Sequence, residues 1–289
     1  MTLVLAVDIG GSFVKSAVTR PDGQLYDFQK VATPTSLDAF MLVMDQLVDA
    51  NDIQGIAISS PGSIESSGLN VGYSAVPYLY HENLKVLCEG RYGVPVSIEN
   101  DGNCAALAEY ECGAAEGIAS FVCIVIGTGI GGGIVHHGEL LRGAHLHAGE
   151  FGYLMLDMAN GNTWSETGSS SALTKRAGFL NGEEVFKRAG HSPEAASALE
   201  HFFHTLAAGI FSIQYILDPQ RVLLGGGITQ QSAFLKGINE AIEALYRQKS
   251  YAAVKPEIRL CQAGSHAQLT GAVHLWKKQW KDEAGCLQE

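Results

Sequence analysis

The sequence lacks several features that would place it in well-known functional classes. No apolar stretch approaches the ~18 residues that a membrane-spanning helix needs. The opening residues MTLVLAVDIGG have no basic flank, so we expect no signal peptide. Positive charge is scarce, since 19 Lys and Arg stand against 30 Asp and Glu, a formal net charge of −11. A nucleic acid or an anionic membrane repels such a chain, so we expect neither as a partner. The missing signal peptide and membrane span lead us to expect a cytoplasmic location.

Two common kinds of motif are also missing. The six cysteines contain no Cys-x-x-Cys pair, which argues against a disulfide framework and against a metal cluster and favours reduced thiols. A G-x-x-x-x-G-K-[ST] phosphate loop is absent, and the glycines do not follow the strand-to-helix order of a dinucleotide-binding fingerprint.

Glycine is abundant, at 34 of 289 residues, and it gathers where three hydrophobic strands end. The turns contain Gly10, Gly11 and Ser12; Gly127, Thr128, Gly129 and Gly131; and Gly225, Gly226 and Gly227. Backbone N–H groups of such turns can bind phosphate without any net positive charge, so an acidic protein can still bind a nucleotide. One glycine pair would predict only a tight turn. Three such turns, two of them with a hydroxyl residue, favour a nucleotide site.

The pattern of strand, glycine turn and strand over residues 3–18 recurs over residues 121–135, which indicates an internal duplication. Helices are predicted from Ser36 to about 48, around 82–92, over 102–113 and 193–218, up to about 247, and at the C-terminal end. Further strands are predicted at 53–62, 94–100, 221–225 and 257–262, with a loop-rich stretch over 136–182. Alternating strands and helices predict an α/β fold.

Asp101 directly follows the apolar strand predicted at 94–100 and stands at the start of a helix of small residues. The positive end of the helix dipole keeps a carboxylate ionised at this place. Phosphoryl transfer needs alignment, charge neutralisation by Mg²⁺ and a base that accepts the hydroxyl proton. Asp101 can be that base, while the alternative from the residues alone is a simple helix cap.

Five motifs resemble, in the same order, those of the ROK family (repressors, open reading frames and sugar kinases). They are DIGGS (8–12), IENDGNCAALAE (98–109), IGTGIGGGIV (126–135), HAGEFG (147–152) and LLGGGI (223–228). The resemblance implies two ribonuclease-H-like domains of the sugar kinase/actin/Hsp70 superfamily that flank an active-site cleft. We expect one domain over 1–116 with a C-terminal helix at about 268–285, and the other over 117–267. The implied reaction is ATP-dependent phosphorylation of a sugar hydroxyl, usually O6.

The resemblance also implies roles for individual residues. Asp101 matches the catalytic base, and Asp8 lies near Mg²⁺, which it contacts through water. The three glycine turns hold ATP. Asn100, Glu150 and Glu166 match positions that contact the sugar, although the match at Glu166 requires a small gap.

One position departs from the family pattern. Most members have G-E-x-G-H followed by three zinc-binding cysteines, whereas Tyr153 stands here at the histidine position and residues 155–166 contain no cysteine. We therefore expect no structural zinc, with the Tyr153 hydroxyl replacing the histidine contact to the sugar. Members of this zinc-less kind resemble bacterial β-glucoside kinases, glucokinases and N-acetylmannosamine kinases.

We expect glucose or a β-glucoside as the substrate, with N-acetylmannosamine as the alternative, and a homodimer. Two other classes stay open: a sugar-responsive repressor and a non-catalytic sugar-sensing protein. A repressor would need a helix-turn-helix, and we expect no room for one before the first glycine turn. Asp101 and the three glycine turns argue against a protein that only binds sugar.

Overall fold

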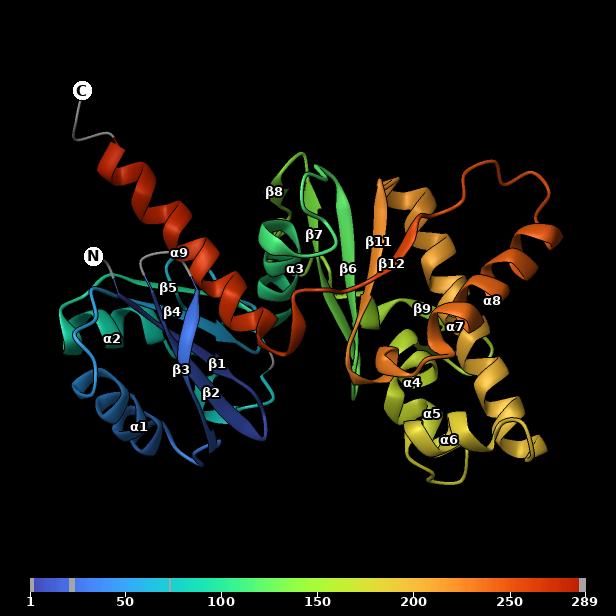
Figure 1. The fold of residues 1–289 in the computed structure, drawn as a ribbon, viewed down its shortest axis with the longest axis horizontal. Coiled ribbons are helices and arrows are strands. Elements are labelled where there is room, and N and C mark those ends of the chain that lie inside the picture. The colour runs from blue at the N-terminus through green and yellow to red at the C-terminus, as the bar shows by residue number, and fades with distance from the viewer. Residues whose placement is uncertain (1–2, 21–23, 73, 286–289) are drawn as a thin grey trace. The chain divides into compact units, whose positions relative to one another are not determined.

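The computed structural model describes residues 3–20, 24–72 and 74–285, which form two compact units (Figure 1). Unit 1 contains Met1–Gly113, Gly143–His147 and Ala263–Glu289, and unit 2 contains Ala114–Arg142 and Ala148–Gln262. The short segment Gly143–His147, expected in the second domain, clusters with the first. Among the described residues, no helix combines the length and the apolar character that a membrane crossing requires.

Unit 1 is built on a sheet with the strand order β3-β2-β1-β4-β5. Its strands are β1 Val4–Ile9, β2 Phe13–Thr19, β3 Leu25–Ala32, β4 Gly55–Ser60 and β5 Val96–Asn100. Strands β1, β4 and β5 are parallel, and β2 is antiparallel to both of its neighbours. The carboxyl ends of the three parallel strands therefore meet at one edge, the place where open α/β sheets bind ligands.

Helices cover both faces of this sheet (Figure 1). They are α1 Leu37–Asp49, α2 Leu84–Tyr92, α3 Asp101–Cys112 and α9 Ala267–Gly285, with the 3₁₀ turns η1 Pro77–Leu79 and η4 Gly264–His266. Ser36 and Asn83 cap α1 and α2 with their side-chain oxygens, as their residue types favour. On one face α1 buries Phe40 and Met44 and α2 buries Leu84 and Cys88, and α3 and α9 pack on the other face.

The face under α3 and α9 is lined with small side chains. Ala17, Ala6 and Ala57 lie directly opposite one another on β2, β1 and β4. A Cβ atom at Gly271 of α9 would lie 1.8 Å from the carbonyl oxygen of Cys104 in α3, so these helices touch backbone to backbone. Side chains alternate between faces with a period of two, so Asp8, Ser59 and Lys15, each two residues from one of these alanines, make the same face polar at the carboxyl ends of β1 and β4.

Unit 2 contains a second sheet, with the order β12-β11-β6-β7-β8. Its strands are β6 Phe121–Ile126, β7 Ile130–His136, β8 Glu139–Leu140, β11 Arg221–Gly225 and β12 Ile258–Leu260. Strand β6 is antiparallel to β7 and parallel to β11, which is parallel to β12. Both sheets thus share one order and one set of strand directions, in agreement with the duplication that the repeated sequence pattern indicates.

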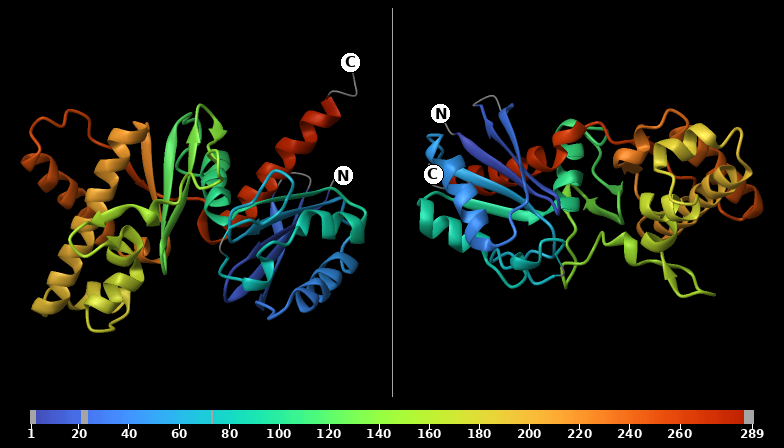
Figure 2. Two further views of the ribbon diagram at one scale, coloured as in Figure 1. Left: turned by 180° about the vertical axis from the view of Figure 1, so that it is seen from behind. Right: turned by 90° about the horizontal axis from the view of Figure 1, so that it is seen from below.

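Two long helices, α7 Pro193–Leu217 and α8 Phe234–Gln248, form the main hydrophobic core of unit 2 together with one face of the sheet (Figure 2). Pro193 occupies the first turn of α7, and Asp218 ends the helix in a left-handed conformation at φ 44°.

The stretch expected to be loop-rich holds several short elements. They are η2 Phe151–Tyr153, the ribbon of β9 Met155–Asp157 and β10 Asn162–Thr163, and the helices α4 Trp164–Gly168 and α5 Ser170–Arg176. Two more short elements follow this stretch, α6 Gly182–Arg188 and η3 Gly227–Gln230. Helices of five to seven residues are too short to show a hydrophobic period in the sequence. The fully buried Trp164 holds α4 in the core instead.

Candidate active site

A polar row crosses four strands of unit 1 at the carboxyl edge of its sheet. The pairing register places Lys15 opposite Asp8, Asp8 opposite Ser59, and Ser59 opposite Glu99. These four side chains lie on the same face of the sheet as Ala17, Ala6 and Ala57. The row joins two carboxylates, one ammonium group and one hydroxyl.

Asp8 is held on both of its carboxylate oxygens. The residue is only 7% exposed, its Oδ1 accepts a hydrogen bond of 2.9 Å from Ser59 Oγ, and its Oδ2 lies 3.4 Å from Lys15 Nζ. A buried carboxylate is costly unless it is paired and hydrogen-bonded, and these two partners meet that need. Asp8 is therefore fixed in place at the base of the first glycine turn.

Asn100 and Asp101 form the junction from β5 into α3. Asn100 caps the helix, since its Oδ1 accepts from the backbone N–H groups of Gly102 and Asn103 at 2.9 and 3.1 Å. Its Nδ2 donates to the carbonyl of Gly62 at 3.0 Å, so both polar atoms of the amide are oriented by contacts within unit 1. Asp101 is the first helical residue and is half-buried, and its Oδ1 lies 2.8 Å from the N–H of Gly102. The helix N-terminus favours the ionised form of a carboxyl group at this place.

The thiol of Cys104 reveals how closely the carboxylates gather. Its pKa is raised well above the usual value, first by complete burial and then by the negative charges of Glu99, Asp8 and Asp101. All three carboxylates therefore lie within electrostatic range of this one atom. Asp8 and Asp101, which the sequence predicted as site residues, both lie at the carboxyl edge of the unit 1 sheet, and their roles stay predictions.

The first glycine turn joins β1 to β2 and is closed by a hydrogen bond of 3.0 Å from Gly10 N to Phe13 O. Thr33, which directly follows β3, holds the turn, since its Oγ1 donates to Gly10 O at 2.6 Å and its N–H donates to Ser12 O at 3.0 Å. Gly11 and Ser12 are exposed at the tip. The backbone of the turn is thus held by Thr33, while its tip is exposed to solvent.

The second glycine turn joins β6 to β7 in unit 2. Gly127 N donates to Gly129 O at 2.9 Å, and Ile130 N donates to Ser165 Oγ at 2.9 Å. A Cβ atom at Gly127 or Gly131 would meet no heavy atom within 4 Å, so the space over these residues is open. An open turn of this kind leaves room for a phosphate against the backbone.

The third glycine turn follows β11 and presses against the end of β6. Gly226 has φ +101°, and a Cβ atom there would lie 2.1 Å from the carbonyl oxygen of Ile126. In register, Gly225 and Gly131 both lie opposite Val125 of β6, at the place that Ser59 and Lys15 occupy beside Asp8 in unit 1. Unit 2 therefore has two glycines without side chains where unit 1 has the side chains of Ser59 and Lys15.

Glu150 precedes the 3₁₀ turn η2, and Tyr153 is its last residue. Glu150 is half-buried at the position before the turn, and its carbonyl accepts from Tyr153 N at 3.2 Å. The Tyr153 side chain is 70% exposed. The expected sugar contacts of these two residues stay predictions.

Glu166 has a structural role that the sequence analysis missed. Its Oε2 accepts from both N and Oγ1 of Thr163 at 2.8 Å, which completes a capping box at the start of α4. These hydrogen bonds, the backbone one first, lower the pKa of Glu166. The spacing Thr-x-x-Glu is the signal that could have identified this box. A sugar contact by Glu166 also stays a prediction.

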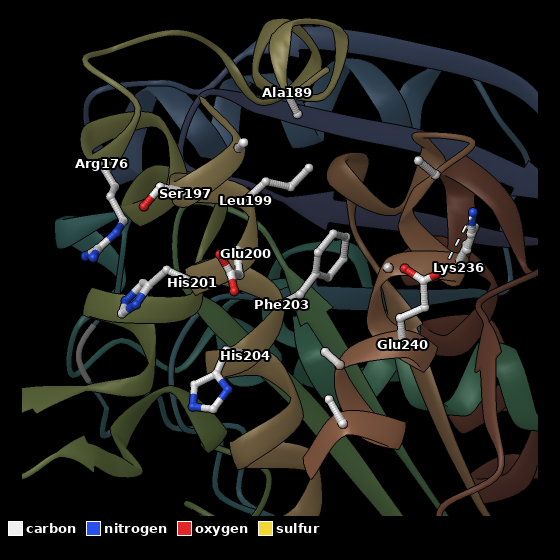
Figure 3. Close-up of a pocket in the computed structure, with 15 residues that line it drawn as sticks. Arg176, Ala189, Ser197, Leu199, Glu200, His201, Phe203, His204, Lys236 and Glu240 are labelled. Carbon is white, nitrogen blue, oxygen red and sulfur yellow. Dashed lines mark ion pairs between the residues drawn. The ribbon is translucent and has the colours of Figure 1, made fainter. Parts of the chain in front are cut away.

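Thr128 and Glu166 line the same groove in unit 2, which has a volume of about 950 Å³. Its wall also contains Ser165, Lys175 and His201. A second groove of about 740 Å³ lies between α7 and α8, with Phe203 in its wall (Figure 3). This second groove contains none of the expected site residues.

Among the described residues, no group of three or more His, Cys, Asp and Glu side chains could hold a metal ion. A magnesium ion held by several protein ligands does not fit this arrangement. Mg²⁺ bound mainly by phosphate and water does fit, since this ion usually keeps several waters and takes only one or two carboxylates. A role for Asp8 in holding Mg²⁺ through water stays a prediction.

Comparison with known proteins identifies the family of the chain. A sequence model of the ROK family matches residues 4–279. The chain is 33% identical to a β-glucoside kinase of Listeria monocytogenes over 83% of this chain and 88% of the relative. A ROK family protein of Streptococcus pneumoniae solved with sucrose superimposes with a TM-score of 0.90 at 32% identity, over 97% of this chain and 100% of that one.

A ROK family glucokinase of Streptomyces griseus, solved with glucose and AMPPNP, has a TM-score of 0.78 at 25% identity, over 94% of this chain and 98% of that one. The α/β units, the order of the glycine turns and these relatives lead to one conclusion. The chain belongs to the ROK family and is a sugar kinase.

Proposed function

We propose that the protein transfers the terminal phosphoryl group of ATP to O6 of glucose or of a β-glucoside, with Asp101 as the general base. The observation that carries this proposal is the carboxyl edge of the unit 1 sheet. Asp101 opens α3 there, capped by Asn100, at the same sheet edge as Asp8. The relative named as a β-glucoside kinase supports this substrate class.

Asp101 accepts the proton of the attacking sugar hydroxyl. The sugar oxygen forms the new bond to phosphorus, the bond from phosphorus to the bridging oxygen of ATP breaks, and the proton passes from the Asp101 carboxyl group to solvent. An ionised carboxylate at a helix N-terminus is prepared for this step, and such a base contributes about 10²–10⁴ in rate.

The three glycine turns are proposed to bind the nucleotide through backbone N–H groups. Their support is the open space over Gly127 and Gly131 and the exposed tip at Gly11 and Ser12. Mg²⁺, when bound, neutralises phosphate charge, and Asp8 is proposed to hold it through water.

The sugar is proposed to contact Asn100, Glu150, Tyr153 and Glu166. Amide and carboxylate groups suit vicinal hydroxyls, because they offer planar donors and acceptors. Asn100 and Glu166 also cap helices, so their orientation is set before any sugar arrives. We further propose a cytoplasmic homodimer, for which sedimentation analysis at several protein concentrations is the test.

The decisive experiment compares Asp101→Asn with Asp38→Asn. Asp38 is an exposed aspartate in the first turn of α1, so its replacement removes the same kind of charge from a helix start elsewhere. We expect Asp101→Asn to lower kcat about 10²–10⁴-fold and to leave sugar binding within a few-fold in calorimetry. Asp38→Asn should retain normal kcat. Near-normal turnover by Asp101→Asn would refute the proposed base.

The substrate is tested by ADP release with glucose, cellobiose, fructose and N-acetylmannosamine. Phosphorus–carbon couplings in the NMR spectrum of the product identify the phosphorylated oxygen. We expect the highest kcat/KM with glucose or cellobiose and a product phosphorylated at O6. A clear preference for N-acetylmannosamine would correct the substrate but not the reaction.

A further inference from the structure

Two lysines of unit 1 face each other across β2 and β3 but have different partners. Lys15 and Lys30 are directly opposed in the register, an arrangement that is unfavourable for like charges. The Lys30 ammonium lies 3.8 Å from the centre of the Phe13 ring, in a cation–π contact. The Lys15 ammonium turns the other way, to Asp8 Oδ2 at 3.4 Å. The two lysines thus form a natural pair for comparison.

The surroundings of Lys15 are unusual for a lysine on a strand. Its side chain is 35% exposed and stands on the face where the buried alanines Ala6 and Ala17 give way to Asp8. Lys15 lies two residues beyond Phe13, whose carbonyl closes the first glycine turn. At about 3.3 Å of rise per residue, the turn is within the length of an extended lysine side chain.

The hydrogen bond from Lys15 to Asp8 is long and engages one of three N–H donors. Lysine binds phosphate as a mobile point charge, and a cation beside the turn adds to the backbone N–H groups in attracting a polyphosphate to a chain with a net charge of −11. In unit 2 the equivalent position beside the strand end is Gly131, which has no side chain. The first glycine turn is therefore the one with a mobile positive charge beneath it.

We propose that Lys15 is a phosphate-binding residue, whose ammonium group leaves Asp8 for the terminal phosphate of the bound nucleotide. This inference rests on the proposed function. In the same movement the Asp8 carboxylate loses its ammonium partner and becomes available to hydrated Mg²⁺. The alternative is that Lys15 only neutralises Asp8 and never meets the nucleotide.

Chemical acetylation of the wild-type protein tests the proposal without any mutation. Acetic anhydride labels lysines at a rate that falls when the amine is occupied, and mass spectrometry of peptides reports Lys15 and Lys30 separately. We expect AMPPNP with Mg²⁺ to slow labelling of Lys15 at least fivefold, and adenosine to slow it less than twofold. Lys30 should be labelled equally in all samples. Unchanged labelling of Lys15 by AMPPNP would overturn the proposal.

Matched variants give a second readout. Lys15→Met should weaken AMPPNP binding at least tenfold in calorimetry and raise the KM for ATP, while sugar KM changes less than twofold. Lys30→Met should change neither. Lys15→Arg keeps the charge and should stay within about threefold of wild-type affinity for AMPPNP.

The two proposals fail in different ways. If Lys15→Met folds and binds AMPPNP as the wild type does, Lys15 only neutralises Asp8, and the inference is wrong while the kinase reaction stands. If the wild type phosphorylates no sugar although AMPPNP protects Lys15, the proposed function is wrong and the phosphate contact stands.

Discussion

Gly226 provides a quantitative test of the third glycine turn. Its backbone has φ 101° and ψ 160°, a combination that only glycine adopts readily. A Cβ atom there would lie 2.1 Å from the carbonyl oxygen and 2.8 Å from the carbonyl carbon of Ile126, which is backbone and cannot rotate away. Gly226→Ala must therefore push η3 away from the end of β6.

The neighbouring Gly227 is a matched control. A Cβ atom at Gly227 would meet nothing within 4 Å, and the residue begins the helical turn η3. Strain in the backbone costs of order 1–3 kcal/mol and the clash adds to it, so we expect Gly226→Ala to destabilise by about 3 kcal/mol. Gly227→Ala should stabilise by about 0.4–1 kcal/mol, because alanine has fewer conformations in the unfolded chain.

Urea unfolding followed by tryptophan fluorescence measures both variants. Trp164 reports directly on the core of unit 2. The two alanine variants should differ in the free energy of unfolding by about 3–4 kcal/mol, in the stated order. Equal stability of the two variants would show that the turn does not press against β6 and would refute the steric argument.

Three further perturbations test the core, a buried carboxylate and a histidine. Gly209→Ala in α7 should destabilise by about 1–3 kcal/mol in urea unfolding despite better helix propensity, because its Cβ would lie 2.3 Å from the fully buried Trp164 ring; an unchanged midpoint would contradict this packing. Asn103→Ala should cost about 1–3 kcal/mol, because its Nδ2 donates to the buried Glu99 carboxylate at 2.9 Å; a loss no larger than that of the exposed Asn239→Ala would contradict it. Burial first, and then Arg176 and His204, lower the pKa of His201 in the folded protein. The unfolded chain therefore binds the proton first, at its pKa of about 6.5. The stability that the neutral His201 contributes is present above that pH and is lost as the pH falls from there to the folded pKa. His201→Gln should therefore lose less stability than the wild type between about pH 7 and 5, and an identical pH profile would refute this assignment.

Much of the fold follows from the sequence because its signals are local. Strands that end in glycine, Ser36 before a helical period and Pro193 at the start of a long helix all lie where the sequence predicts them. The short helices α4 and α5 were missed because tertiary burial of Trp164, and not periodicity, keeps them folded.

The candidate site was predicted in part. Asp101 was predicted from its place after a strand, Asp8 from its place beside a glycine turn, and Asn100 from the family resemblance. All three lie at one edge of the sheet, and their roles stay predictions. The contacts of Lys15 and Ser59 with Asp8 were not predicted. Counting outward from the hairpin turn would have paired Lys15 with Asp8, whereas Ser59 pairs with Asp8 between parallel strands, which no local pattern shows.

The most direct test of the central claim is a single-turnover measurement of phosphoryl transfer by Asp101→Asn, with enzyme in excess over radiolabelled ATP and with saturating glucose or cellobiose. This isolates the chemical step from product release. The account predicts a transfer rate at least about 10²-fold below that of the wild type, with sugar affinity nearly unchanged. A transfer rate close to that of the wild type would show that another group accepts the proton, and the account would be wrong.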